Sequence, residues 1–102
     1  EEIRTLSKKT PCAIYKYSPD CGICKFIKIR IESDWSFSNQ ELIPYLIDVA
    51  QYKQLAQEVA DAFQNPHQSP QVLLIRDGIC TYDAEGFDIT VEELRECYED
   101  SF

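Results

Sequence analysis

The sequence has no long hydrophobic run and few basic residues. These two features argue against a membrane-spanning protein and against a protein that binds nucleic acids or anionic membranes. Its longest apolar stretches, such as residues 72–75, have the length of a strand and are far too short to cross a bilayer. Ten lysines and arginines stand against eighteen aspartates and glutamates, which gives a formal net charge of -8. Because an acidic surface repels phosphate groups, this balance argues against nucleic-acid binding and against anionic membranes. A net charge far from zero keeps a protein soluble, and this effect is sufficient to explain the excess of acidic residues.

The sequence also lacks internal repeats, linkers and low-complexity tracts, so we expect residues 1–102 to form a single domain. A chain of this size buries roughly two-thirds of its unfolded surface and can build a core without covalent staples. Its hydrophobic content of 44% is that of a globular protein.

Only one pair of cysteines has the spacing of a motif, Cys21 and Cys24. The cysteines are five in number, so a complete set of disulfides would leave one unpaired. A reduced, cytoplasmic protein with one redox pair explains this better than a secreted scaffold, and no signal peptide is visible. A zinc site needs about four ligands, usually in paired clusters, and no second pair is present. We therefore expect no metal and no cofactor, and we interpret Cys12, Cys80 and Cys97 as packing residues.

Helical and strand patterns alternate along the chain. The predicted elements, in order, are a helix over 1–9, a strand over 12–17, a helix over 22–35, a strand over 42–49, a helix ending near 64, strands over 71–76 and 79–82, and a final helix after Thr90. The intervening segments 36–41 and 65–70 are expected to be loops. Asp77-Gly78 is typical of a tight hairpin turn, and a strand–helix–strand unit favours parallel pairing. The order predicts an α/β fold, a four-stranded mixed sheet flanked by helices on both faces.

Local patterns add detail to two of these helices. Apolar residues at helical spacing predict the buried stripe of the helix over 22–35, and these are Ile23, Phe26, Ile27 and Ile31. The next helix is expected to be capped by Asp48, with Gln51 three residues later. Its predicted apolar face consists of Tyr52, Leu55, Ala56, Val59 and Phe63.

Pro44 and Thr90 carry positional predictions. Pro44 cannot donate a backbone hydrogen bond, so we expect it at a strand position that needs no ladder bond. Thr90 and Glu93 have the spacing of a capping box for the final helix, whose apolar residues are Val91, Leu94 and Tyr98.

The Cys21-Gly22-Ile23-Cys24 segment lies where a strand gives way to a helix, and this position favours redox chemistry. The unpaired N–H groups and the dipole at a helix N-terminus stabilise an anion, so the pKa of the Cys21 thiol should fall. The thiolate is the attacking species in disulfide exchange. Cys24 lies one turn further on the same face and can reach the Cys21 sulfur. Lys25 and Lys28 should favour the thiolate, whereas Asp20 should oppose it.

The segment before the strand at 71–76 supplies the remaining candidate residues. Together with the cysteine motif and the strand order, Ser69-Pro70 predicts a cis peptide bond, which shapes a turn and exposes the backbone of Ser69 to an extended ligand. His67, the one histidine, lies in the same loop and is either a partner of the thiols or a solvated side chain.

With these motifs in view, the sequence resembles the thioredoxin superfamily. A narrower resemblance, to the monothiol bacilliredoxin-type proteins, covers about residues 12–94. It rests on three blocks, residues 17–24, 67–78 and 88–90. The usual motif of that family is threonine, cysteine, proline, isoleucine, serine, and this sequence has Asp20, Gly22 and Cys24 in place of the threonine, proline and serine. The buried acid that thioredoxins carry six residues before the first cysteine is replaced by Tyr15.

The resemblance implies a thioredoxin-like fold and a nucleophilic cysteine, Cys21, that acts on mixed disulfides between proteins and a low-molecular-weight thiol. The expected function is a thiol–disulfide oxidoreductase with Cys24 as the resolving cysteine, with His67, Ser69 and Pro70 beside the substrate, and with an upstream reductant. One alternative is a monothiol enzyme of the bacilliredoxin type that uses an external thiol. Another is a thioredoxin-fold binding module without turnover. Neither nucleic acid nor a membrane is an expected partner.

Overall fold

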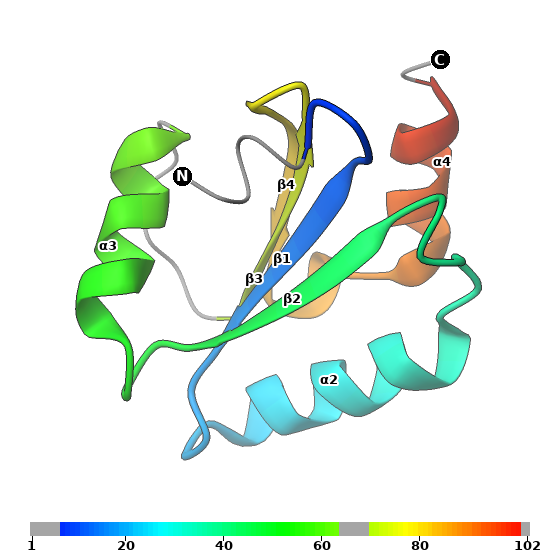
Figure 1. Cartoon of the computed structure of the whole chain (residues 1–102). Coiled ribbons are helices and arrows are strands. Elements are labelled where there is room, and N and C mark those ends of the chain that lie inside the picture. The colour runs from blue at the N-terminus through cyan, green and yellow to red at the C-terminus, as the bar shows by residue number, and fades with distance from the viewer. Residues whose placement is uncertain (1–6, 64–69, 101–102) are drawn as a thin grey trace.

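The computed structural model describes residues 7–63 and 70–100 and has four strands in one mixed sheet. The strand order is β2-β1-β3-β4. Helix α3 covers one face of the sheet, and α2 and α4 cover the other (Figure 1). The elements are β1 (Cys12–Tyr17), α2 (Gly22–Asp34), β2 (Ile43–Asp48), α3 (Lys53–Ala62), β3 (Gln71–Arg76), β4 (Ile79–Glu85), the 3-10 helix η1 (Gly86–Asp88) and α4 (Val91–Asp100). The predicted fold class is confirmed.

Strands β1 and β3 form the centre of the sheet, and both have the predicted bounds. β1 pairs with β2 in parallel and with β3 in antiparallel orientation. Both are buried over five successive residues, as expected of strands covered by helices on two faces. The carboxyl end of β1 leads directly into the turn before α2, which places the cysteine motif at one end of the sheet.

Strand β2 forms one edge of the sheet, and Pro44 fits this place. The N–H of Ile43 donates to the carbonyl of Pro11 at 3.0 Å, so the next residue turns its backbone away from β1. Pro44 therefore costs the ladder no hydrogen bond, as the sequence predicted.

The β3–β4 hairpin turns at Asp77 and Gly78, also as predicted. Their φ angles are 54° and 78°, the left-handed values that a tight hairpin of this kind requires at both central residues. The turn is held by the segment before β1, because Ser7 accepts hydrogen bonds from the N–H groups of both residues. β4 continues to Glu85, three residues beyond the predicted end.

Helix α2 has the predicted position but a different buried face. Cys24 and Ile27 are buried, and Ile31 packs beside them, whereas Ile23 and Phe26 are 43% and 54% exposed. The predicted stripe was therefore wrong at two of its four positions. The reason is that α2 has apolar residues on several sides, so spacing alone does not select the side that meets the sheet.

Helix α3 is shorter than predicted and turns a narrower face inward. It begins at Lys53, because Asp48 Oδ1 accepts hydrogen bonds from the N–H groups of Ala50 and Gln51 and forms a separate turn before the helix. Tyr52 and Leu55 are largely exposed, contrary to the prediction. The buried residues of α3 are Ala56, Val59 and Ala60.

Helix α4 is capped by Thr90, whose hydroxyl accepts a hydrogen bond from the N–H of Glu93 at 3.1 Å. The Glu93 carboxylate is engaged elsewhere, because it accepts a hydrogen bond from the Tyr82 hydroxyl at 2.7 Å. Val91, Leu94 and Tyr98 are buried as predicted. The predicted helix over 1–9 lies largely outside the described residues, and residues 7–9 form a turn.

Candidate active site

Cys21 is the N-cap residue of α2, at the junction that the sequence predicted. Its φ and ψ of -94° and 118° are extended, while its carbonyl already accepts a hydrogen bond from the N–H of Lys25. The turn of residues 18–21 delivers it there, because the Cys21 N–H donates to the carbonyl of Ser18 at 3.1 Å. The Cys21 sulfur thus occupies the place of an N-cap side chain and accepts a hydrogen bond from the Cys24 N–H at 3.2 Å.

Cys24 lies beneath Cys21 and is 1% exposed. Its sulfur accepts a hydrogen bond from the N–H of Ser18 at 3.5 Å, and its carbonyl accepts one from the hydroxyl of Tyr15 at 2.8 Å. Both cysteines are free thiols in this structure. The arrangement places a partly exposed sulfur above a buried one within a single helical turn.

The pKa of the Cys21 thiol is lowered, and the cause is Cys24. The largest contribution is a hydrogen bond from the Cys24 side chain, followed by the Cys24 N–H, and the Ile23 N–H adds a smaller contribution. Lys25 and Lys28, which the sequence suggested as the source of positive charge, are not among the causes. Lys28 instead pairs with Glu32 at 2.9 Å. The pKa of Cys21 is therefore set by local hydrogen bonds that stabilise its thiolate.

Tyr15 is the residue of this site that the sequence did not assign. In the sequence it stands out only as the replacement for the buried acid of thioredoxins. Its side chain is 4% exposed and stacks on Tyr17, with ring centroids 5.8 Å apart. Burial raises the pKa of the Tyr15 phenol far above its ordinary value, and the nearby Cys24 and Cys21 raise it further. The alternation of β1 could have revealed the contact, because it turns residues 13, 15 and 17 toward α2.

Pro70 lies at the same end of the sheet as the cysteines. It is buried and directly precedes β3, and its carbonyl accepts a hydrogen bond from the N–H of Gly86 at 3.2 Å. β1 and β3 are antiparallel and Lys16 pairs with Gln71, so Pro70, the residue before Gln71, is level with Tyr17 along the sheet. Tyr17 is four residues before Cys21 in the sequence. Ser69, His67 and the Ser69–Pro70 peptide bond lie outside the described residues, so the predicted cis bond and the place of His67 stay predictions.

The other cysteines pack against the cores of the two sheet faces. Cys12 is fully buried and belongs to the cluster beneath α3, where Cys80 also packs. Cys97 packs on the opposite side, against the cluster beneath α4. Over residues 7–63 and 70–100, no three His, Cys, Asp or Glu side chains come together as metal ligands.

Lys16 is an unexpected buried charge near the active-site end of β1. It is 0% exposed, and its Nζ lies 3.4 Å from Gln71 Oε1. Its strand position turns it toward α3, on the side of the sheet opposite Tyr15. Burial lowers the pKa of its amino group.

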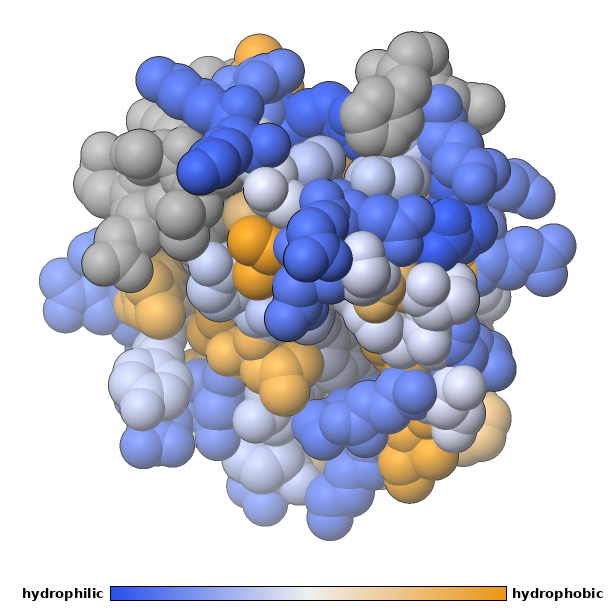
Figure 2. Space-filling model, turned by 45° about the vertical axis from the view of Figure 1, so that its right-hand side comes forward, coloured by the Kyte–Doolittle hydropathy of each residue, from blue (hydrophilic) through white to orange (hydrophobic). Residues whose placement is uncertain are grey.

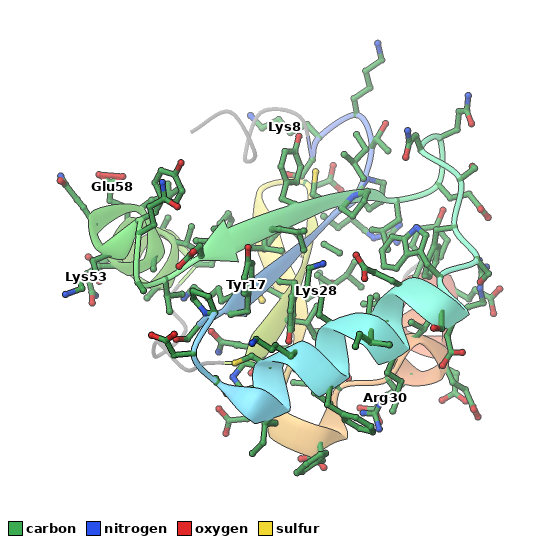
Figure 3. All side chains as sticks on the ribbon, turned by 90° about the horizontal axis from the view of Figure 1, so that it is seen from below. Lys8, Tyr17, Lys28, Arg30, Lys53 and Glu58 are labelled. Atoms are coloured by element: carbon green, nitrogen blue, oxygen red, sulfur yellow. The ribbon has the colours of Figure 1, made fainter. Side chains whose placement is uncertain are left out.

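Apolar side chains are exposed beside the cysteines. Ile23 and Phe26 on α2 and Phe87 on η1 are between 43% and 60% exposed, and the rings of Phe26 and Phe87 meet edge to face at 6.0 Å. Arg30 joins the two elements, because it donates hydrogen bonds to the carbonyls of Phe87 and Ile89. Figure 3 shows Arg30 and Lys28 leaving α2 on different sides, and Tyr17 near the junction of β1 and α2.

A second apolar feature is a pocket of about 390 Å³ that Tyr15 helps to line. It is lined by β1, β2, α2 and the start of α4, and its lining includes Ile31, Trp35 and Leu94. Figure 2 shows one face of the molecule, where apolar residues form separate small areas among mostly hydrophilic ones. None of the described helices is long and apolar enough to span a membrane.

The fold is shared with solved thioredoxin structures. The chain is similar to the thioredoxin of Fasciola hepatica, with 19% identity, a TM-score of 0.71, and coverage of 97% of this chain and 88% of the other. It is similar to a variant thioredoxin from Halobacterium salinarum, with 19% identity, a TM-score of 0.72, and coverage of 98% and 81%. For the thioredoxin of Schistosoma mansoni the identity is 17%, the TM-score 0.71, and the coverage 99% and 85%. No curated protein sequence matches this chain significantly. These structural matches establish a thioredoxin-like fold.

A family model described as monothiol bacilliredoxin BrxC matches residues 1–94, most of the chain. Family and fold agree with the thiol pair at the start of α2, and together they support a redox function of the thioredoxin-like type. The narrower of the two resemblances in the sequence is thereby confirmed: the chain belongs to the monothiol bacilliredoxin BrxC family.

Proposed function

We propose that this protein is a cytoplasmic thiol–disulfide oxidoreductase that reduces disulfides of proteins or mixed disulfides with a low-molecular-weight thiol. The observation that carries the proposal is the pairing at the start of α2, where the Cys24 N–H donates to the Cys21 sulfur at 3.2 Å. A thiol whose pKa is lowered in this way is a thiolate more often at neutral pH, and it is also partly exposed. Cys21 is therefore the nucleophile of the proposed reaction.

The reaction has two exchanges, and two thiols supply its two electrons. The Cys21 thiolate attacks one sulfur of the substrate disulfide, which forms a mixed disulfide with Cys21 and releases the other sulfur as a thiolate. Cys24 then loses its proton, and its sulfur attacks Cys21, which forms the Cys21–Cys24 disulfide and releases the second substrate thiolate. A thiol or dithiol reductant must afterwards reduce this disulfide, because Cys21 and Cys24 have passed both of their electrons to the substrate.

Pro70 and the exposed apolar residues provide the docking side of the proposal. Pro70 lies across the end of the sheet from the motif, and its loop, with Ser69 and His67, is the proposed contact for the substrate backbone. Ile23, Phe26 and Phe87 offer apolar contacts to residues next to a protein cysteine that is bound to Cys21. A small disulfide is too short to use these contacts fully.

A monothiol mechanism is the second candidate, and the family description favours it. In this mechanism an external thiol resolves the mixed disulfide on Cys21, and Cys24 serves only in packing. The 1% exposure of Cys24 is compatible with such a packing role.

Three variants separate these possibilities. The purified, reduced protein is first mixed with insulin or oxidised glutathione without any added thiol, and turnover is then measured with 2-mercaptoethanol as reductant, relative to the rate without protein. We expect Cys21→Ser to abolish the catalysed reduction of both substrates and, in the mixture without added thiol, Cys24→Ser to accumulate mixed disulfides on Cys21, detected by mass spectrometry. Cys97→Ser is the matched control, because Cys97 packs on α4 away from the motif, and it should keep full activity.

Full turnover by Cys24→Ser would support the monothiol mechanism and contradict the resolving role of Cys24. Failure of the unchanged protein to reduce either disulfide would contradict the enzymatic proposal itself and leave a binding module. The Phe26→Ser variant adds a test of docking, since it should slow insulin reduction more than reduction of oxidised glutathione. Equal slowing of both would contradict the docking role of Phe26.

A further inference from the structure

Tyr15 connects the centre of the sheet to the first turn of α2. Its ring is buried on the α2 side of β1, and its hydroxyl donates to the Cys24 carbonyl at 2.8 Å. In a regular helix that carbonyl also accepts a hydrogen bond from the N–H four residues later, at Lys28. The helix therefore does not depend on Tyr15 to satisfy this carbonyl.

Cys24 is held by hydrogen bonds at each of its polar groups. Its N–H donates to the Cys21 sulfur, its own sulfur accepts from the Ser18 N–H, and its carbonyl accepts from Tyr15. Two of these partners, Cys21 and Ser18, belong to the turn before α2. Tyr15 is the partner that comes from β1, a buried central strand of the sheet, and its hydrogen bond ties Cys24 to the sheet.

We propose that Tyr15 is a positioning residue of the redox site, whose hydroxyl holds residue 24 so that its N–H and thiol stay directed at the Cys21 sulfur. The proposal rests on the proposed function in that Cys21 is the nucleophile. Tyr15 does not touch the reacting sulfur by a hydrogen bond of its own. It acts through Cys24, the residue that stabilises the Cys21 thiolate.

The chemistry of a buried phenol fits this role. A carboxylate at the same position would place a negative charge near two thiols and oppose the formation of either thiolate. The Tyr15 phenol stays neutral at physiological pH, because burial and both cysteines raise its pKa. It can therefore donate a hydrogen bond at every pH at which the thiols react, and it adds no charge of its own.

The test is the Tyr15→Phe variant, which keeps the ring and its packing and removes only the hydroxyl. The rate of Cys21 alkylation by iodoacetamide is measured against pH and assigned to Cys21 by peptide mass spectrometry. We expect the midpoint of the profile to rise and the rate at neutral pH to fall about two- to tenfold, the range that one hydrogen bond corresponds to. Tyr82→Phe is the matched control. It loses a phenol hydroxyl bonded to Glu93, away from the thiols, and its profile should not move.

An unchanged alkylation profile in a folded Tyr15→Phe protein would overturn the proposal, as would equal shifts in both variants. Urea unfolding of each variant shows whether it is folded. If Tyr15→Phe does not fold, the positioning of Cys24 is tested in the unchanged protein by measuring the hydrogen-exchange rate of the Cys24 amide proton. That amide should be protected well beyond the other amides of the first turn of α2, and equal protection would contradict the proposal. Alkylation needs no substrate, so this outcome is independent of whether the protein reduces disulfides.

Discussion

Gly22, between the two cysteines, is the site of a substitution whose effect follows from the backbone. It is the first residue of α2, and its φ is not among the positive values of the chain. A Cβ added there meets no atom within 4 Å. We therefore expect both Gly22→Ala and Gly22→Pro to be accommodated without strain.

Proline is compatible with this position for two further reasons. The first helical residue has no partner for its N–H within the helix, so the missing donor costs nothing. The residue before a proline must be extended, and Cys21 has φ and ψ of -94° and 118°. Proline at this position is also the residue of the usual family motif in the resemblance described above.

The expected gain follows from the reduced freedom of the unfolded chain. A substitution of this kind stabilises a protein by about 0.4–1 kcal/mol when the native backbone already fits. For a domain of this size that corresponds to a rise in Tm of roughly 2–8 °C. The measurement is thermal or urea unfolding of the fully reduced protein, so that no disulfide contributes.

Gly86→Ala is the matched control and should have the opposite sign. Gly86 also has open space for a Cβ, but its φ is 61°, a conformation that costs an alanine roughly 1–2 kcal/mol. A loss of stability in Gly22→Pro, or equal effects at Gly22 and Gly86, would refute the reasoning from backbone angles.

Three further outcomes are expected. Alkylation of Cys21 should have a midpoint below that of an ordinary thiol, because hydrogen bonds lower its pKa, and a profile like that of a free cysteine would contradict this. Burial lowers the pKa of Lys16, so between that pKa and its ordinary value the unfolded chain binds more protons and stability rises with pH. Urea unfolding at neutral pH and at about pH 9 should therefore show the unchanged protein gaining stability relative to Lys16→Met, whereas a constant difference would refute it. Thr90→Ala should cost about 1 kcal/mol of unfolding free energy through the lost N-cap bond to Glu93, and Thr90→Ser should retain most of it.

The sequence predicted the centre of the fold because the central strands have unambiguous patterns. β1 and β3 are buried on both faces and read as continuous apolar runs, so their bounds were correct to the residue. Asp77-Gly78 fixed the hairpin, since few other dipeptides fit two positive φ angles. The expectation of a single domain over residues 1–102 stays a prediction.

The buried faces of the helices were harder to predict, because a periodic pattern shows which residues share a helix face but not which face packs on the sheet. α2 has isoleucine or phenylalanine at five of its residues, and the side that meets the sheet was chosen by tertiary packing around Cys24 and Ile27. At the site, the helix terminus was predictable from Cys21 and its neighbours. The hydrogen bond from Tyr15 was not, because the alternation of β1 indicates the face to which Tyr15 points but not which atom of α2, nine residues later, its hydroxyl reaches.

Cys24 has two separable roles, and the choice of substitution distinguishes them. Its backbone N–H bonds the Cys21 sulfur whatever the side chain is, while its sulfur stabilises the Cys21 thiolate, accepts the Ser18 N–H and, in the proposed reaction, resolves the mixed disulfide. A serine hydroxyl can donate to Cys21 and accept from Ser18, but it cannot form a disulfide. Alanine can do none of these. We therefore expect Cys24→Ser to keep Cys21 alkylation close to that of the unchanged protein and to lose only internal resolution, whereas Cys24→Ala should also slow alkylation at neutral pH. The same slow alkylation in both variants would mean that the sulfur itself, and not a hydrogen bond from residue 24, sets the acidity of Cys21.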